Sequence, residues 1–259
     1  MEIHFYKYQG TGNDFVMIDN RAQFFPKNNH SLIRQLCDRR FGVGADGLIL
    51  LENTNDVDFK MVYFNADGIE GSMCGNGGRC LVAFANQLGI IDSKATFNAV
   101  DGLHHAKFNN GIVSLQMIDV AKISTHDKHF FLDTGSPHHI EIVDKVNQVD
   151  VKKKGSKIRN GGPYFDEGTN VNFVEIVDNH SIKVRTYERG VEDETLSCGT
   201  GVTAAVIATF NAGITTAKKI DVEALGGKLS VSFEKENETY KNIFLTGSAT
   251  FVFKATIQI

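Results

Sequence analysis

The chain has 259 residues, of which 42% are hydrophobic and 22% charged, so it can bury a core and is not expected to be disordered. This length is long for a single core and sufficient for two domains of ordinary size. A net charge of −4 without a basic block argues against nucleic acid or an anionic membrane as the main partner. The N-terminus lacks a signal-peptide pattern and no apolar run is long enough to span a membrane, so we expect a cytoplasmic protein with reduced cysteines.

Segments rich in aromatic and β-branched residues predict strands at 2–8, 14–19, 48–52 and 58–64. Between them, a helix is expected from Ser31 to Arg40, with Ser31 as its N-cap. Its apolar face would be formed by Leu32, Ile33, Leu36 and Cys37. Cys37 is therefore interpreted as a packed core thiol.

Two further helices are expected at 77–88 and 201–212, and both are apolar nearly all round, so they should be buried on all sides. Strand-like segments follow each helix. They lie at 95–99, 104–109 and 112–117 after the first, and at 218–224, 228–234, 242–246 and 249–258 after the second.

A cysteine, a glycine, a small polar residue and another glycine precede each of these helices. The two copies are Cys74–Gly77 and Cys198–Gly201. Asn65 and Arg189 each lie nine residues before their cysteine, and Gly89 and Gly213 each follow theirs by fifteen. One repeat of about half the chain predicts two similar lobes rather than a solenoid.

The predicted fold is α+β, with two similar lobes that each wrap a mixed, mostly antiparallel sheet around one central buried helix. Short connections favour the antiparallel pairing. We expect residues 1–119 to form the N-terminal lobe with Cys74, and residues 120–248 the C-terminal lobe with Cys198. The last strand, about 249–259, could pack with the first lobe; the pattern alone leaves this open.

A cysteine at a helix N-terminus lies beside unpaired backbone N–H groups and the positive end of the helix dipole, which stabilise a thiolate. The same N–H groups bind carboxylates. Two such motifs brought together would hold one carboxylate with a thiol on each side, which suits inversion at the α-carbon of an amino acid. One thiolate would remove the α-proton and the opposite thiol would return a proton to the other face.

Other uses of the cysteines fit less well. Cys74 and Cys80 are separated by five residues and neither motif contains histidine, so a zinc site is not expected. A phosphate-binding loop would need a lysine that both motifs lack. Cys80 lies inside an expected apolar helix and is interpreted as a residue of the packed core. A hydrolase with one nucleophilic thiol, and an amino-acid binding protein without catalysis, stay open as alternatives.

The chain resembles the diaminopimelate epimerases over essentially its whole length. Seven motifs occur in the family's order: Gly10–Phe15, Phe64–Gly68, Cys74–Gly77, Gly135–His138, Thr169–Asn172, Tyr187–Gly190 and Cys198–Gly201. The resemblance implies interconversion of L,L- and meso-diaminopimelate without cofactor or metal, in the synthesis of lysine and peptidoglycan precursors. It also implies a homodimer.

By position, the resemblance makes Cys74 and Cys198 the catalytic pair, assisted in proton transfer by His138 and Glu188. The reacting carboxylate would be held at the two helix ends, and the distal end of the substrate by polar side chains, with Glu188 also among the binding residues. The implied binding residues are Gly75, Asn76, Gly199 and Thr200 at the helix ends, and Asn13, Asn65, Asn170 and Arg189 at the distal end.

Some of these residues also have a purely structural interpretation. Asn13 and Asn65 could only shape turns, His138 could lie on the surface, and Glu188 with Arg189 could form a solvated ion pair.

Three features depart from the family pattern. Gly47 stands where some members carry a glutamine that touches substrate, and Ser136 stands where others carry asparagine. The segment 190–195 is one residue longer than usual, which could shift Arg189. The nearest rival is a proline racemase or hydroxyproline epimerase of the same superfamily, but these have histidine where this chain has Asn76. A phenazine-pathway-type isomerase is disfavoured because it lacks the cysteine pair.

Overall fold

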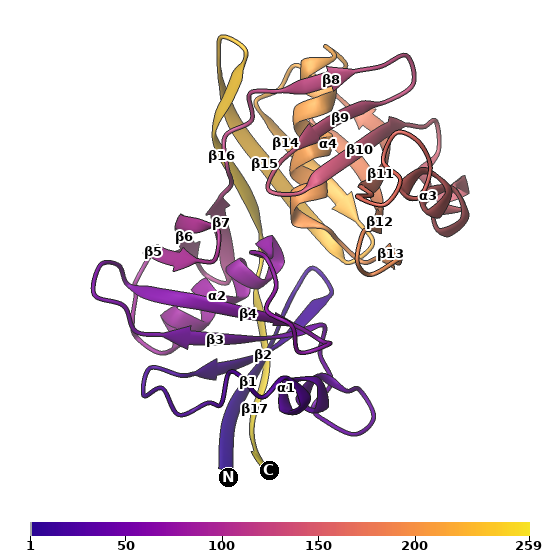
Figure 1. Ribbon diagram of the computed structural model, residues 1–259. Coiled ribbons are helices and arrows are strands. Elements are labelled where there is room, and N and C mark those ends of the chain that lie inside the picture. The colour runs from indigo at the N-terminus through magenta and orange to yellow at the C-terminus, as the bar shows by residue number, and fades with distance from the viewer. Residues whose placement is uncertain (1) are drawn as a thin grey trace. The chain divides into compact units, whose positions relative to one another are not determined.

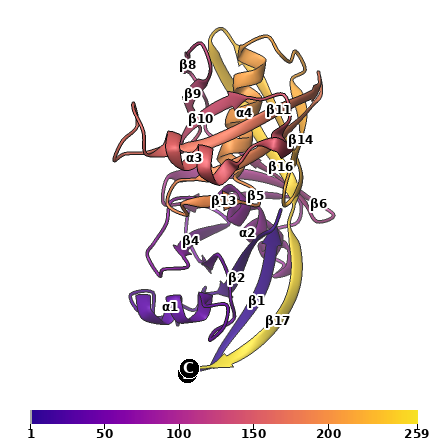
Figure 2. The same ribbon diagram turned by 90° about the vertical axis from the view of Figure 1, so that its right-hand side faces the viewer.

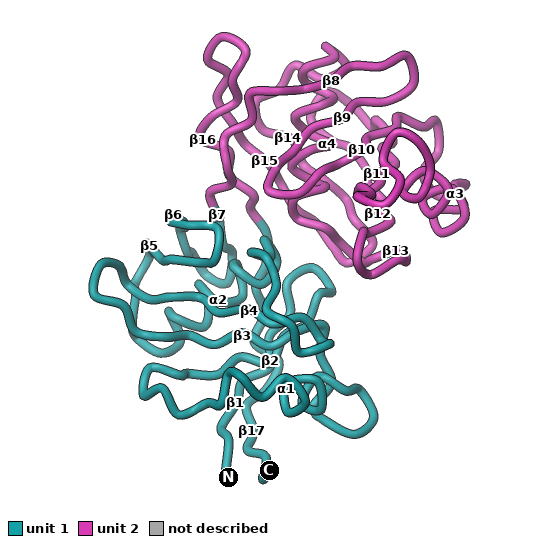
Figure 3. Tube along the Cα trace, viewed as in Figure 1, with its two compact units in different colours: residues 1–115, 247–259 teal, residues 116–246 magenta. Residues whose placement is uncertain are grey.

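The structure, a computed structural model, describes residues 2–259 and divides into two compact units. Unit 1 contains the described residues up to Leu115 together with Gly247–Ile259, and unit 2 contains Gln116–Thr246 (Figure 3).

Unit 1 is a mixed sheet with two helices (Figure 1). β1 pairs antiparallel with β2, β3 with β4, β5 with β6, and β6 with β7. The pairs β2–β3 and β4–β5 are parallel, and each is connected through a helix, as a parallel crossover requires. The elements are β1 (Glu2–Gly10), β2 (Asn13–Asp19), α1 (His30–Cys37), β3 (Gly47–Glu52), β4 (Phe59–Asn65), α2 (Gly75–Gln87), β5 (Lys94–Ala99), β6 (Gly102–Asn109), β7 (Ile112–Gln116) and β17 (Thr250–Gln258).

Unit 2 repeats this plan. β9 pairs antiparallel with β10, β11 with β12, and β14 with β15, while β10–β11 and β12–β14 are parallel and connected through α3 and α4. The elements are β8 (Ile123–Thr125), β9 (Phe130–Asp133), β10 (Pro137–Ile142), the 3₁₀ turn η1 (Val146–Gln148), α3 (Val151–Arg159), β11 (Asn170–Asp178), β12 (Ser181–Glu188), β13 (Asp193–Thr195), α4 (Gly199–Asn211), β14 (Lys219–Ala224), β15 (Gly227–Glu236) and β16 (Thr239–Ser248).

The order strand, helix, two strands, helix, two strands is therefore common to both units, with α2 and α4 in equivalent places; unit 2 has the additional short strand β13 before α4. This confirms the predicted α+β fold of two similar lobes. The parallel pairs make the sheet mixed, as predicted. That each helix joins two parallel strands was not predicted.

α2 and α4 are each enclosed by the strands of their own unit. α2 packs against β1, β2, β3, β4, β6 and β17, and α4 against β9, β10, β11, β12 and β15. Residues 75–85 of α2 and nearly all of 199–209 of α4 are buried. This burial follows from helices with almost no polar face, because such a helix is stable only when covered on all sides.

The opposite face of the unit 1 sheet is covered by α1. Leu32, Ile33, Leu36 and Cys37 pack there with residues of β1 to β4, as their spacing predicted. Because helices cover both faces, every residue of β3 is buried, which explains why its apolar run is unbroken rather than alternating. In unit 2, α3 packs on β11 and β12 in the same way, around Val151 and Phe173.

The predicted start of α1 is wrong by one residue and its predicted end by three. The helix runs His30–Cys37 and its N-cap is Asn29, whose side-chain oxygen accepts from the Leu32 N–H at 3.1 Å. Ser31, the expected cap, lies inside the helix and donates to the same oxygen of Asn29 at 2.7 Å. α2 and α4 begin two residues earlier than expected.

The last strand belongs to unit 1. β17 pairs antiparallel with β1 along nearly its full length, from Glu2 opposite Gln258 to Gln9 opposite Thr250. Figure 2 shows the two strands running side by side. The chain thus leaves unit 1 near Leu115 and returns to it after Thr246.

Candidate functional site

Cys74 is the N-cap residue of α2. Its backbone is extended, with φ −105° and ψ 119°, and the helix begins at Gly75. The first-turn N–H groups of a helix have no partner within the helix, so they and the helix dipole act on whatever lies at the cap. Here that group is the half-buried Cys74 thiol. Asn76 follows in the first turn and is only 1% exposed.

Asn13 connects Cys74 and Asn76. Its side-chain oxygen accepts from Cys74 Sγ at 3.6 Å and from Asn76 Nδ2 at 3.4 Å. Asn13 is the first residue of β2, immediately after the tight turn at Thr11 and Gly12, both of which have positive φ. This turn brings a residue sixty-one positions before Cys74 against its thiol.

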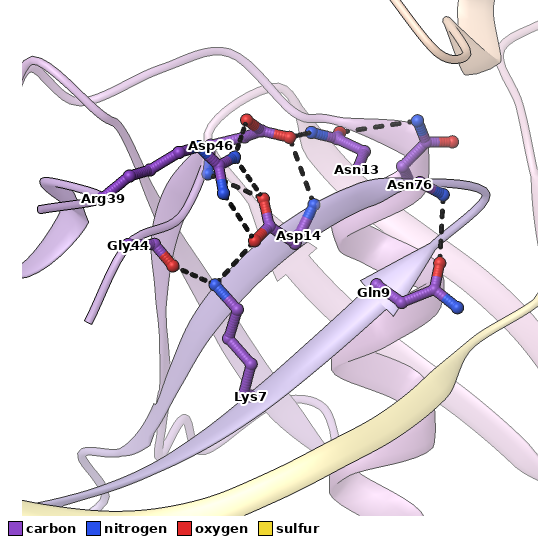
Figure 4. Close-up of polar contacts among 9 residues, drawn as sticks. Lys7, Gln9, Asn13, Asp14, Arg39, Gly44, Asp46 and Asn76 are labelled. Atoms are coloured by element: carbon purple, nitrogen blue, oxygen red, sulfur yellow. Dashed lines mark hydrogen bonds and ion pairs between the residues drawn. The ribbon is translucent and has the colours of Figure 1, made fainter. Parts of the chain in front are cut away.

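A charged network fixes the other side of Asn13 (Figure 4). Asn13 Nδ2 donates to Asp46 Oδ2 at 2.6 Å, and Arg39 Nη2 donates to Asp46 Oδ1 at 2.6 Å. Arg39 also holds Asp14 through two hydrogen bonds, and Lys7 forms an ion pair with Asp14 at 2.7 Å. Burial raises the pKa of Asp14, but the hydrogen bonds and charges of Arg39 and Lys7 outweigh it and bring that pKa down to about 2.

Lys7 is the unusual member of this network, because its side chain is only 8% exposed. A buried ammonium is costly unless it is paired and hydrogen-bonded. Its Nζ pairs with Asp14 and also donates to the carbonyl oxygen of Gly44. The buried charge is thereby compensated, and β1, β2 and the loop before β3 are tied together around Asn13.

Arg79 adds a second buried cation close to the first motif. It lies on α2 with its residue 0% exposed, and Nη2 donates to the Thr11 hydroxyl at 2.8 Å. Burial lowers the pKa of this guanidinium, while the nearby Cys80 and Cys74 act in the opposite direction. Arg79 thus places a positive charge behind the first turn of α2.

Asn65 ends β4 and is exposed, on the same strand face as Tyr63 two residues earlier. The Tyr63 ring lies between two glycines. A Cβ atom on Gly47 would be 2.5 Å from Tyr63 Cε2, and one on Gly71 would be 2.7 Å from Cε1. The ring therefore occupies the space that a side chain at position 47 would need, which accounts for the glycine there.

In unit 2, Cys198 is the N-cap of α4 and is 8% exposed. Its Sγ lies 3.4 Å from the Thr200 hydroxyl. That hydroxyl is 2.9 Å from His138 Nε2, and the Thr134 hydroxyl donates to the Thr200 carbonyl at 2.9 Å. β9, β10 and α4 thus meet at the first turn after Cys198.

His138 is fully buried rather than on the surface. Its Nδ1 is 3.0 Å from Asn172 Nδ2, which also donates to the carbonyl of His139 at 3.3 Å. The Thr186 hydroxyl donates to the Asn172 oxygen at 2.8 Å. Because Nδ1 accepts from an amide N–H, the neutral ring carries its proton on Nε2 and donates it to Thr200. Burial, and secondarily the charge of Arg189, lowers the pKa of His138 to about 3, which keeps it neutral.

Asn170 and Arg189 lie together at the ends of β11 and β12. The Asn170 oxygen accepts the Arg189 backbone N–H at 3.0 Å, and its amide group donates to Ser136 Oγ at 2.8 Å. Ser136 therefore accepts a hydrogen bond from Asn170 and helps to fix its side chain. The Arg189 guanidinium donates to the carbonyl of Glu167 at 3.0 Å.

Glu188 is the last residue of β12 and pairs with Asp193 across the tight turn that contains Gly190 and Glu192, both with positive φ. The segment 190–195 forms this turn and β13 (Asp193–Thr195). Glu188, expected from the resemblance to assist proton transfer and to bind substrate, therefore lies at the end of β12 next to Arg189 in the chain.

Cys37 and Cys80 are buried free thiols, as predicted. Burial raises the pKa of each to about 12, so neither ionises near neutral pH. Among residues 2–259, no group of three or more His, Cys, Asp or Glu side chains is arranged to hold a metal ion. Within the same range, no helix has the length and apolarity needed to cross a membrane.

Several residues that shape the two motifs were not singled out from the sequence. They are Asp46, Arg39, Lys7, Arg79, Tyr63, Asn172, Thr186 and Thr134. Most act through contacts between residues far apart in the chain, which local patterns do not reveal. Asn172 alone carried a signal, since it lies in the Thr169–Asn172 motif.

Comparison of the sequence with known proteins identifies its relatives. A family model described as "Diaminopimelate epimerase" matches residues 5–117 and 130–252. The chain is 59% identical to the diaminopimelate epimerase of Flavobacterium psychrophilum over 97% of this chain and 99% of that protein. It is 44% identical to the diaminopimelate epimerase of Chlorobaculum tepidum over 96% of this chain and 99% of that one.

Solved structures share the fold at low sequence identity. A phenazine biosynthesis protein of the PhzF family from Bacillus anthracis matches with a TM-score of 0.78 at 14% identity, covering 100% of both chains. A hydroxyproline epimerase from Agrobacterium vitis matches with a TM-score of 0.71 at 13% identity, covering 99% of this chain and 92% of that one. These likenesses establish the architecture only, whereas the match over nearly the full sequence is specific: the chain belongs to the diaminopimelate epimerase family.

Proposed function

We propose that this chain interconverts L,L- and meso-diaminopimelate by moving one α-proton, with Cys74 and Cys198 as the two acid–base groups and no cofactor. One cysteine, as thiolate, removes the proton from the α-carbon. The other, as thiol, gives a proton to the opposite face, and the two exchange protonation states in the reverse direction.

The observation that carries the proposal is that each unit presents one cysteine at the N-cap of its own enclosed helix. Equivalent positions in a repeated fold give two groups of the same chemistry, which a reversible inversion needs. The first-turn N–H groups of α2 and α4, with Gly75, Asn76, Gly199 and Thr200, are suited to hold the carboxylate next to the reacting carbon. Binding the carboxylate there stabilises the carbanion that forms when the proton leaves.

The groups around Cys198 support proton transfer. In this proposal, neutral His138 and the Thr200 hydroxyl act as a hydrogen-bonded pair that can stabilise a thiolate at Cys198. Glu188 is proposed to assist the thiols from the end of β12. Asn13, Asn65, Asn170 and Arg189 would fix the distal end, where a guanidinium can grip a carboxylate with two parallel hydrogen bonds.

A racemase of proline or hydroxyproline is the alternative, because a hydroxyproline epimerase has this fold. Asn76 stands where those enzymes have histidine, and the near full-length relatives are named diaminopimelate epimerases. The substrate assignment therefore favours diaminopimelate. Synthesis of lysine and peptidoglycan precursors in the cytoplasm, and a homodimer, are part of the same proposal.

The test is incubation of the purified enzyme with L,L-diaminopimelate in heavy water without added cofactor. Deuterium should enter one α-position and the meso isomer should form. Exchange at both α-positions of one bound molecule, or turnover of proline with none of diaminopimelate, would contradict the proposal.

Variants separate the two thiols. Cys74→Ala and Cys198→Ala should each abolish inversion, while Cys37→Ala, which removes a buried thiol outside the motifs, should leave it intact. Full activity in either motif variant would exclude the two-base mechanism. Binding of substrate without any deuterium exchange in the wild-type enzyme would instead indicate a binding protein.

A further inference from the structure

We propose that Asp46 is a positioning residue: it fixes the amide of Asn13 with its oxygen toward Cys74 and so favours the protonated form of that thiol. The proposal concerns the site of the proposed function, but it is tested by the ionisation of Cys74 rather than by turnover. Its failure and that of the proposed function can therefore be told apart.

The orientation of Asn13 is the first step. A carboxylate can only accept hydrogen bonds, so the 2.6 Å contact between Asp46 Oδ2 and Asn13 requires the amide nitrogen of Asn13 on that side. The amide oxygen must then point the other way, toward Cys74 Sγ at 3.6 Å and Asn76 Nδ2 at 3.4 Å. Figure 4 shows Asn13 between Asp46 on one side and Asn76 on the other.

The second step is that Asp46 is itself fixed. Its Oδ1 accepts from Arg39 Nη2 at 2.6 Å, and its backbone N–H donates to the Asp14 carbonyl oxygen at 2.9 Å. Arg39 in turn donates a hydrogen bond to Asp14, and Asp14 also forms an ion pair with Lys7. The carboxylate of Asp46, although 42% exposed, is therefore held in one place by groups from α1's C-terminal loop and from β2.

The third step concerns the thiol. An amide oxygen 3.6 Å from Cys74 Sγ can accept a hydrogen bond from S–H but repels a thiolate. The α2 N-terminus acts the opposite way, because its dipole and N–H groups favour the thiolate. Asn13 thus counteracts the helix at Cys74 and keeps this thiol available as the proton donor that a two-base inversion needs.

The direct test is Asp46→Asn. Arg39 has only donors and lies 2.6 Å from Oδ1, whereas the Asp14 backbone N–H, the other fixed donor, lies 3.2 Å from Oδ2. The new amide oxygen should therefore stay on the charged Arg39 and its NH₂ should face Asn13. The Asn13 amide would then turn, presenting its own NH₂ to Cys74 and stabilising the thiolate. Alkylation by iodoacetamide, followed at the Cys74 peptide by mass spectrometry across pH, should show a midpoint lower than in the wild type by about one pH unit.

The charge lost in this variant would by itself lower the same midpoint, so a second background is needed. In Asn13→Ala, the amide that transmits the effect is gone, and Asp46→Asn should then change the Cys74 midpoint little. An equal shift of the Cys74 midpoint in the wild-type and Asn13→Ala backgrounds would mean a through-space charge effect and would overturn the proposal. The absence of a shift in both backgrounds would overturn it as well. Asp58→Asn, which removes an exposed carboxylate of the same unit, controls for net charge and should leave the midpoint unchanged.

Two further variants guard against a folding defect. Asp46→Glu keeps an acceptor and should retain a midpoint near that of the wild type. Asp46→Ala, which removes the acceptor without adding a donor, should shift the midpoint downward by less than Asp46→Asn. A larger shift in Asp46→Ala, with the thermal midpoint of unfolding unchanged, would contradict the role assigned to the amide.

Discussion

Asn172 Nδ2 donates a hydrogen bond to His138 Nδ1 at 3.0 Å, and this contact selects the imidazole tautomer that faces Cys198. The ring proton is left on Nε2, which lies 2.9 Å from the Thr200 hydroxyl. Thr200 in turn lies 3.4 Å from Cys198 Sγ. A buried amide on the neighbouring strand β11 therefore determines which atom of His138 can serve the thiol.

The first prediction concerns this amide. In Asn172→Asp the new carboxylate can only accept from Nδ1, so the ring proton should move there and the pKa of His138, now about 3, should rise. Epimerase activity should fall about 100-fold, as expected when a group supporting proton transfer has the wrong tautomer. Nitrogen NMR of the histidine ring reports the tautomer. Asn160→Asp, an exposed site in the same unit, is the matched control and should change neither quantity.

The second prediction concerns acid stability. Burial, followed by the charges of His129, Lys154 and His126, lowers the pKa of His139 to about 3. Between that value and the ordinary pKa near 6.5, the unfolded chain binds the proton and the folded chain does not, so stability falls as the pH drops through this window. His139→Phe removes the titrating group and keeps an aromatic ring in the stack with His129.

The difference in unfolding free energy between pH 7 and pH 5 should therefore shrink by about 2 kcal/mol in His139→Phe. Urea denaturation at the two pH values measures it. The hydrogen bond to Tyr164 is lost at both pH values, so it lowers stability without altering the difference. An undiminished difference would show that His139 is protonated in the folded protein. His180→Phe, at an exposed position, should leave the difference as it is.

The third prediction compares two glycines in equivalent first helical turns. A Cβ atom on Gly78 would meet the mobile end of Met73 at 2.7 Å, whereas one on Gly201 would lie 2.3 Å from Asn172 Oδ1. Gly78→Ala should be tolerated and should stabilise the folded protein by about 0.5–1 kcal/mol, because alanine favours a helix. Gly201→Ala should displace Asn172 and reduce activity at least as much as Asn172→Asp. Thermal unfolding with activity assays distinguishes the outcomes; equal effects would contradict the geometry.

The fourth prediction tests whether the absence of a side chain at Gly71 makes room for the Tyr63 ring. In Gly71→Ala the new Cβ would lie 2.7 and 2.9 Å from Tyr63 ring atoms, so the ring must move, with a cost of about 1–3 kcal/mol. Combining Gly71→Ala with Tyr63→Ala should recover much of that cost relative to Tyr63→Ala alone. A double-mutant cycle of unfolding free energies measures the coupling. Strict additivity of the two changes would mean that the ring is not held by Gly71.

The sequence was most informative where the signal is local or repeated. The unbroken apolar runs after Cys74 and Cys198 predicted α2 and α4, because a helix without a polar face has to be enclosed. The matched spacings around them predicted the duplicated plan. The buried face of α1 followed from Leu32, Ile33 and Leu36, although its cap was assigned to Ser31 rather than Asn29, since both residue types favour that position.

Long-range contacts escaped the sequence reading. Nothing local indicates that Asp46 holds Asn13, that Lys7 is buried with Asp14, or that Asn172 faces His138, because each pair is brought together by strand pairing. The strands between 123 and 195 were also not assigned, and with them α3. That helix has many lysines and few apolar residues, so its buried positions Val151 and Gly155 give only a weak periodic signal.

The pairing of β17 with β1 bears on how this chain acquires its structure during synthesis. Unit 2 is made from one continuous stretch, Gln116–Thr246, whereas unit 1 needs a strand that is translated after unit 2. One edge of β1 therefore stays unpaired until residues 250–258 have emerged from the ribosome. Unit 2 can complete its own sheet before that moment, so the order of folding need not follow the order of translation.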